Sequence, residues 1–276
     1  MSFKDKDDLQ DNVEALEGMT IRQIASEQNL ATLREQWGMV LSGERKYIEK
    51  QLINDIIEQD YFKVPKNSSE DPDLILNDGD MFELKVSHLF NSRGLIRPKY
   101  RLVLKVLNYE DMAAHQNWKD SALYNKLRQM VIVFYYKDQE KPPWEWIVSN
   151  SFIWQSSDFD ERIQIDYTLT RDRVLAGQKI SESDTKLLAN CPKHNSKFCW
   201  WCHIGDECNN PKKKHPAPHP VLDGALRKHP AMGMAEKRGY CIPAQYMAVI
   251  FSNQIRMTLV KKGTSYGVPI ENVRYL

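Results

Sequence analysis

The chain has 276 residues, 42% of them hydrophobic and 27% charged, which is the composition of a globular protein. Its formal net charge of +1 excludes a global positive field, so an anionic partner requires a local basic surface. No stretch reaches the roughly 18 apolar residues of a membrane span, and the N-terminus has no signal-peptide core. We therefore expect a cytoplasmic protein that does not associate with membranes.

The first 60 residues are expected to be helical. Thr20 and Gln23 have the spacing of a capping box, and Ile21 and Ile24 follow at helical spacing. A second helix is predicted within residues 45–62, where apolar residues recur on one side: Ile48, Leu52, Ile53 and Ile56. The polar segment 63–73, with two prolines, is typical of a loop.

Strand patterns begin after this loop. FELKV (82–86) is short, and YRLVLKVLNY (100–109) is nearly all apolar, as in a central strand. Residues 111–129 are predicted to be helical and lead into a buried strand, MVIVFYY (130–136). A further strand, an amphipathic stretch and a C-terminal strand or helix are expected at 144–154, 160–178 and 246–260. The order of elements predicts an α/β fold with a mixed central sheet flanked by helices.

The FELKV strand carries two charged side chains on one face. Residues i and i+2 of a strand share a face, so Glu83 and Lys85 point away from Phe82, Leu84 and Val86. Alone, such a pair is most often a solvated surface. A carboxylate here could also bind a hard divalent cation, with the lysine orienting an attacking water. The second carboxylate would come from the acidic residues upstream, which are Asp71, Asp73, Asp78 and Asp80.

Four of the five cysteines lie within 18 residues, in a segment (191–231) without apolar periodicity. The C-x2-C pair at Cys199 and Cys202, together with Cys191 and Cys208, is typical of a tetrahedral structural zinc site. The alternative is a set of partly buried thiols in a loop. The basic runs 211–215 and 225–229 predict contacts with DNA phosphates or base edges.

Several segments resemble one family in the same order along the chain. Residues 19–25 are similar to an N-terminal helix of MutH, a mismatch-repair nicking endonuclease, and FELKV is similar to its catalytic strand. Four further segments resemble the related GATC-cutting type II restriction endonucleases: 100–111, 125–136, 177–194 and 238–251. The chain thus resembles the MutH-like PD-(D/E)xK endonucleases, closest to the restriction enzymes.

The resemblance implies a single endonuclease domain over residues 1–276 with a restriction-endonuclease-like core. Its parts would be a helical region (1–60), a catalytic core (61–190), the Cys/His-rich insertion (191–231) and the C-terminal part of the core (232–276). The implied activity is Mg²⁺-dependent hydrolysis of phosphodiester bonds at a short site in double-stranded DNA. The implied catalytic residues are Asp73, Glu83, Lys85 and Lys126, with Mg²⁺ on Asp73 and Glu83.

Two positions depart from the family pattern. The usual spacing of the first acid falls on Leu76, so Asp73 implies a longer turn, and Asp78 and Asp80 are its rivals. The family's helical glutamate matches Asn54, beside Asp55, which leaves that auxiliary role without a residue.

The resemblance also bears on the insertion. The family carries a cysteine near Cys191, so a histidine could replace Cys191 in the zinc site. The family's DNA-reading loop starts at the match to Pro192 and Lys193. The expected DNA contacts are Lys193, His194, Lys212, Lys213, Arg227, Lys228 and Arg238.

Three functions follow, and the first is favoured. A type II restriction endonuclease of a prokaryotic or viral restriction system would act as a homodimer on a near-palindromic site. A MutH-like nickase could act as a monomer. A zinc-stabilised DNA-binding protein would retain a nuclease core that no longer cuts.

Overall fold

The computed structural model describes residues 3–65, 72–100, 102–106, 109–155, 160–177, 190–191, 196–197, 221–223, 239–242, 244–262 and 265–276. They belong to two compact units. The first comprises Met1–Lys99, Gln129–Trp154 and Phe251–Leu276, and the second comprises Tyr100–Arg128 and Gln155–Ile250. Each unit is described by itself.

The N-terminal part of the first unit is helical, as predicted. It contains α1 (Lys6–Ala15), α2 (Ile21–Ile24), α3 (Glu27–Leu41), α4 (Lys50–Asp55) and the π-helical η1 (Ile56–Tyr61). The capping box at α2 is confirmed, because the Thr20 hydroxyl accepts from the Gln23 amide and the Gln23 side chain accepts from the Thr20 amide. The predicted second helix is α4 continued by η1.

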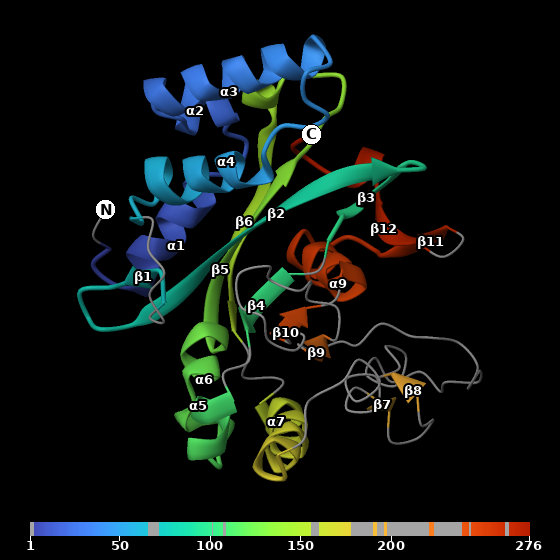
Figure 1. Cartoon of the computed structure of the whole chain (residues 1–276). Coiled ribbons are helices and arrows are strands. Elements are labelled where there is room, and N and C mark those ends of the chain that lie inside the picture. Colours follow the sequence, from blue (N-terminus) through green and yellow to red (C-terminus); the bar gives the residue numbers. More distant parts are fainter. Residues whose placement is uncertain are drawn as a thin grey trace. The chain divides into compact units, whose positions relative to one another are not determined.

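A mixed sheet forms the centre of the first unit (Figure 1). Its strand order is β11 (Val260–Lys262), β12 (Ser265–Pro269), β3 (Leu95–Pro98), β2 (Met81–Ser92), β5 (Gln129–Tyr136) and β6 (Ile147–Gln155), with β1 (Leu74–Ile75) paired to β2. β2 runs parallel to β5 and antiparallel to β1 and β3. The predicted α/β class with a mixed central sheet is confirmed.

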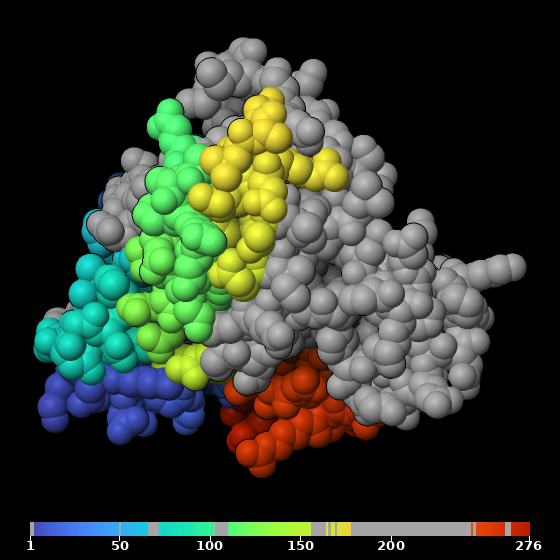
Figure 2. Space-filling model, turned by 90° about the horizontal axis from the view of Figure 1, so that it is seen from below, coloured from blue at the N-terminus to red at the C-terminus, as the bar shows by residue number. Residues whose placement is uncertain are grey.

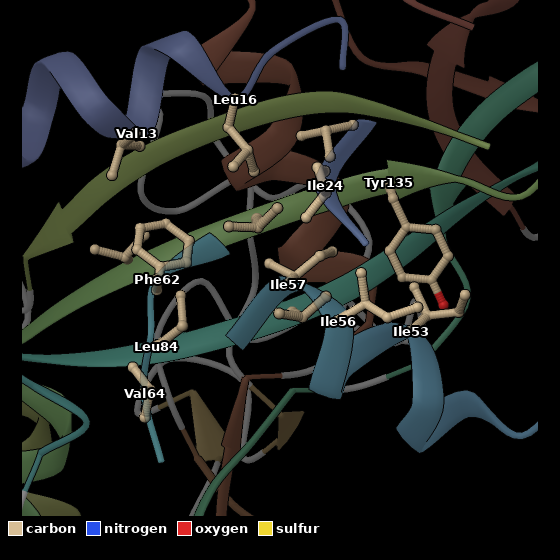
Figure 3. Packing of buried hydrophobic residues seen from close by; sticks show 14 of the residues in the cluster. Val13, Leu16, Ile24, Ile53, Ile56, Ile57, Phe62, Val64, Leu84 and Tyr135 are labelled. Carbon is tan, nitrogen blue, oxygen red and sulfur yellow. The ribbon is translucent and has the colours of Figure 1, made fainter. Parts of the chain in front are cut away.

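One face of this sheet packs against the N-terminal helices. Phe82, Leu84 and Val86 of β2 enter a cluster with residues of α1, α2, α4 and η1, and all three are almost fully buried. Figure 3 shows Leu84 beside Phe62 and Tyr135 beside Ile53, both within this cluster. The apolar residues of FELKV therefore anchor the strand, because burying each side chain stabilises the fold by about 1.5–3 kcal/mol.

The opposite face has its own apolar layer. Phe134 of β5 contacts Phe152 of β6, with ring centroids 6.1 Å apart. It also meets Phe251 edge-on at 5.4 Å. Phe251 lies in α9 (Ala244–Gln254), so the predicted strand or helix at 246–253 is a helix. The sheet is thus covered on both faces, as a parallel pair of central strands requires.

The second unit contains a separate three-stranded sheet in the order β4 (Leu102–Val106), β10 (Gly239–Ile242) and β9 (Val221–Asp223). The prediction of a central strand at 100–109 is therefore wrong, since β4 lies at the edge of this small sheet within the described residues. Its apolar composition did not distinguish the two cases, because an edge strand of a small sheet can be as apolar as a central strand. A two-stranded pair, β7 (Asn190–Cys191) and β8 (Ser196–Lys197), completes the strands described in this unit.

Besides the part of α9 up to Ile250, four helices are described in the second unit. They are α5 (Tyr109–Ala114), η2 (Trp118–Asp120), α6 (Ala122–Leu127) and α7 (Asp160–Leu175). Figure 2 shows α7, in yellow, beside α5 and α6, in green. The Trp118 amide donates to Gln164 Oε1 at 3.0 Å, and the Tyr167 hydroxyl donates to the His115 carbonyl at 3.1 Å. No helix among the described residues is long and apolar enough to span a membrane.

Candidate active site

Glu83 and Lys85 form an ion pair on β2, opposite in direction to the apolar residues of the strand. Only 4% of the Glu83 side chain and 19% of the Lys85 side chain are exposed. A solvated surface pair would be open to water on most of its area. Burying charges is costly unless they are paired, so this pair belongs to an enclosed polar site and not to surface decoration.

The neighbouring parallel strand fixes the place of this pair in the sheet. Glu83 pairs in register with Met130 of β5, and Lys85 pairs with Ile132. Both partners are fully buried. The charged pair therefore borders an apolar wall on one side, which lowers the local dielectric and strengthens electrostatic interactions within the site.

Asp73 lies across the β1–β2 hairpin from Glu83. Leu74 pairs with Phe82 and Ile75 with Met81, so continuing this antiparallel register places Asp73 opposite Glu83. The Leu84 amide donates to Asp73 Oδ2 at 3.0 Å, which holds the carboxylate against β2. The Asp73 carboxylate therefore lies beside Glu83, although the two residues are ten positions apart in the sequence.

The rival acids lie in the turn of the same hairpin. Asp78 is exposed, and its Oδ1 accepts from the Asp80 amide at 3.0 Å. The Asp80 carbonyl accepts from the Leu76 amide at 2.8 Å, which closes the turn. Asp80 thus lies in the turn before β2, which begins at Met81, and does not share the strand face of Glu83 and Lys85.

Another acidic residue, Glu58 on η1, interacts electrostatically with Asp73, Glu83 and Lys85. Burial, together with the nearby Asp73 carboxylate, raises the pKa of Glu58 to about 7. Lys85 opposes this shift, while Asp55 and Glu83 add to it. The charges of three of the four residues predicted to be catalytic therefore influence the pKa of Glu58. It was missed from the sequence, which pointed to Asn54 and Asp55.

The π-helical geometry explains why Glu58 was missed. The sequence comparison assumes regular helical spacing, but from Ile56 onward the chain is π-helical, with a wider turn that rotates the following side chains. Asp55 instead accepts a hydrogen bond from Gln51 Nε2 at 2.7 Å. A search for any acid within one further turn of the helix would have found Glu58.

The remaining predicted residues lie elsewhere or outside the described part of the chain. Lys126 is buried on α6, in the second unit. The backbone of Cys191 is in β7, but its side chain and the rest of the predicted zinc site, Cys199, Cys202 and Cys208, lie outside the described residues. So do all seven predicted DNA contacts: Lys193, His194, Lys212, Lys213, Arg227, Lys228 and Arg238.

The donor set at β2 fits a magnesium ion. Mg²⁺ is typically held by one or two carboxylates together with water and substrate phosphates, so it does not need a dense cage of side chains. Asp73 and Glu83 would supply two carboxylate ligands across the hairpin. No group of three metal-binding side chains occurs among the described residues.

The family comparison matches this region. The model described as MutH, DNA mismatch repair enzyme MutH, matches residues 62–166, a segment that includes Asp73, Glu83, Lys85 and Lys126. No curated protein matches the chain. This match supports the assignment to the MutH-like PD-(D/E)xK endonucleases that the sequence resemblance predicted. This class comprises hydrolases that act on DNA.

Proposed function

We propose that the chain is a type II restriction endonuclease that cuts both strands of a short, specific double-stranded DNA site. The observation that supports it most directly is the buried Glu83–Lys85 pair with Asp73 held opposite by the Leu84 amide. A chain without catalytic function would gain stability by replacing such a buried pair with apolar residues.

Four side chains are assigned roles. Asp73 and Glu83 would hold Mg²⁺, which is typical of this family and which, when bound, supplies Lewis acidity and a water of lowered pKa. Lys85 orients the attacking water and, with its positive charge, stabilises the negative charge that develops on the phosphate. We assign Lys126 to electrostatic support of this centre on the basis of the family pattern.

Glu58 has the position of an auxiliary acid. Its carboxyl has a pKa of about 7, so near neutral pH it exchanges a proton readily. A group with a pKa near the working pH can accept a proton from a water molecule or return one to the leaving oxygen. We therefore assign Glu58 an auxiliary acid–base role beside Asp73 and Lys85.

The insertion is assigned to DNA reading and zinc binding. The expected ligands are Cys191, Cys199, Cys202 and Cys208, with a histidine as the alternative to Cys191. The basic residues around them, from Lys193 to Arg238, would contact the DNA. A restriction enzyme with one centre per chain needs two copies to cut both strands, so we propose a homodimer on DNA in a cytoplasmic restriction system.

Two other functions use the same residues. A MutH-like nickase would cut one strand, and a zinc-stabilised DNA-binding protein would bind without cutting. Incubation of the purified protein with supercoiled plasmid and Mg²⁺ separates the three: discrete linear fragments, nicked circles, or a mobility shift with intact plasmid. Linear fragments with uniform ends are the expected result. Intact plasmid, with Mg²⁺ present and the protein folded, would overturn the proposal.

A further inference from the structure

The far end of β2 carries a second charged region, which differs from the candidate active site in that all its charges are positive. β2 leaves Glu83 and ends nine residues later at Ser92, in a hairpin with β3, and β12 and β11 lie beside this end (Figure 1). Five cations gather on these strands and on the segment that leads to β11. We call them the basic edge: Arg93, Arg97, Arg256, Lys261 and Lys262.

Four of the five cations lie on the paired strands β3 and β11–β12 or in the β2–β3 turn, and Arg256 lies on the segment before β11. Lys262 Nζ donates to the Arg93 carbonyl at 3.2 Å, which joins the two hairpin tips. β12 pairs with β3, and Gly267 permits this close approach, since a Cβ there would lie 2.8 Å from the Ile96 carbonyl oxygen. Lys261 Nζ lies over the Tyr266 ring on the same hairpin, 5.5 Å from the ring centroid, which is a cation–π contact.

The charge of the basic edge is not neutralised within the described residues. No carboxylate there forms an ion pair with any of the five cations, and Glu271 is the acidic residue in segments 90–99 and 255–272. Burial lowers the pKa of Arg97, whose guanidinium lies 4.9 Å from the Phe90 ring. Concentrated positive charge repels itself, which points to an anionic partner.

Two of the arginines occupy backbone positions that normally take glycine or asparagine. Arg93 has φ 58° and Gly94 has φ 78°, which are the left-handed angles of a two-residue type I′ hairpin. Arg256 has φ 53° at the end of α9, where the Met257 amide donates to the Ser252 carbonyl as in a Schellman motif. An arginine at such a position costs about 1 kcal/mol relative to glycine.

Protection of a sheet edge does not explain this arrangement. Lysines on an edge strand such as β11 often prevent pairing with other chains. That role accounts for Lys261 and Lys262 but not for Arg97, which lies on the interior strand β3. Nor does it account for arginines at two turn positions where asparagine would be easier and equally polar.

We infer that the basic edge binds the phosphate backbone of the DNA duplex that flanks the cut site. This inference rests on the proposed function. A strand rises about 3.3 Å per residue, so the hairpin tip lies roughly 30 Å along β2 from Glu83. The same length of duplex is about nine base pairs, close to one helical turn, after which the backbone presents the same face again. Contacts to phosphate carry no sequence information, so the basic edge would add affinity without altering site choice.

The test is a charge-removal variant at positions that tolerate it. Arg93→Asn suits the left-handed turn, and Lys261→Gln and Lys262→Gln remove exposed charges on an edge strand, so the triple variant should fold normally. The matched control removes three exposed cations elsewhere in the first unit, by Lys4→Gln, Arg34→Gln and Lys46→Gln. Binding is measured by fluorescence anisotropy with Ca²⁺ in place of Mg²⁺, across a salt series.

Two duplexes centred on the cut site mapped in the plasmid digestion provide the probes. A duplex of about 12 base pairs is too short to reach the basic edge, whereas a duplex of about 36 base pairs extends beyond it. For the long duplex we expect the triple variant to bind about 10- to 100-fold more weakly near 0.1 M salt, with a salt slope reduced by about 2 to 3. The short duplex and the control variant should show little change.

Unchanged affinity and slope on the long duplex would overturn the inference, as would an equal loss in the control variant or on the short duplex. The proposed function fails separately, if the parent protein leaves the plasmid intact. In that case a long duplex of arbitrary sequence still reports whether the basic edge sets the salt slope.

Discussion

The two ends of strand β2 use charge in opposite ways. At the first end, Glu83 and Lys85 are buried and paired, with a carboxylate opposite and another nearby. At the other end, Arg93 and its neighbours are exposed or half-buried, and none forms an ion pair within the described residues. Buried, paired charges create a precise local field, whereas exposed unpaired cations attract a large anion over a distance. One strand thus carries a candidate site for chemistry and a candidate site for binding.

The largest effect is expected at the buried end. Glu83→Gln or Lys85→Ala should lower cleavage by at least roughly 10³-fold, because each removes charge that acts on the transition state. DNA affinity in Ca²⁺ should change little in comparison. Single-turnover cleavage and anisotropy measure the two quantities. Cleavage at a normal rate in either variant would show that this pair is not catalytic.

Asp73 should behave like Glu83, and Asp78 should not. Asp73→Asn is expected to reduce cleavage by about 10²-fold or more, since it removes a proposed metal ligand while keeping an acceptor for the Leu84 amide. Asp78→Asn, in the exposed turn, is the matched control and should cut normally. The reverse result would move the first metal ligand to the turn and separate it from Glu83.

Glu58 predicts a pH dependence of stability in the absence of metal. Its folded pKa of about 7 lies above the unfolded value near 4.5, so the folded state binds more protons between these pH values. The stabilisation that Glu58 contributes is therefore fully present below pH 4.5 and is lost as the pH rises through 7. The free energy of unfolding should fall by about 1–3 kcal/mol over this range.

Urea unfolding in EDTA at a series of pH values measures this loss. Glu58→Gln should flatten the profile over that window, whereas Glu35→Gln, on the exposed side of α3, should leave it as in the parent. A Glu58→Gln profile identical to the parent would show that Glu58 is not held in the buried, acidic surroundings of Asp73.

The smallest effect is expected at the hairpin tip. Arg93→Asn or Arg93→Gly should raise the free energy of unfolding by a few tenths to about 1 kcal/mol, because both residues adopt φ 58° more easily than arginine. Thermal unfolding measures the gain. A variant that is more stable and yet binds long duplex more weakly would sharpen the contrast between the two ends of β2. A loss of stability would mean that the arginine itself holds the turn.

The helical and strand patterns of the first unit could be predicted because its core is regular. The capping box at Thr20, the apolar side of α4 and the strands at 82–86 and 130–136 all depend on local spacing, which sequence displays directly. The strand at 102–106 was placed wrongly because apolar composition does not tell which sheet a strand joins. Glu58 was missed because a π-helical turn alters the helical phase without a sequence signal.

The sequence by itself displayed the resemblance to the MutH-like enzymes, which the family match over residues 62–166 supports. It also determined the face of β2 that bears Glu83 and Lys85, because strand alternation is a property of each residue and its neighbours. Only the tertiary structure decided that this pair is buried, that Asp73 lies opposite Glu83 and that Glu58 joins them. It also decided that cations from segments more than 150 residues apart, such as Arg93 and Lys262, meet at one edge. These relations depend on how distant segments pair and pack, and spacing along the chain does not encode them.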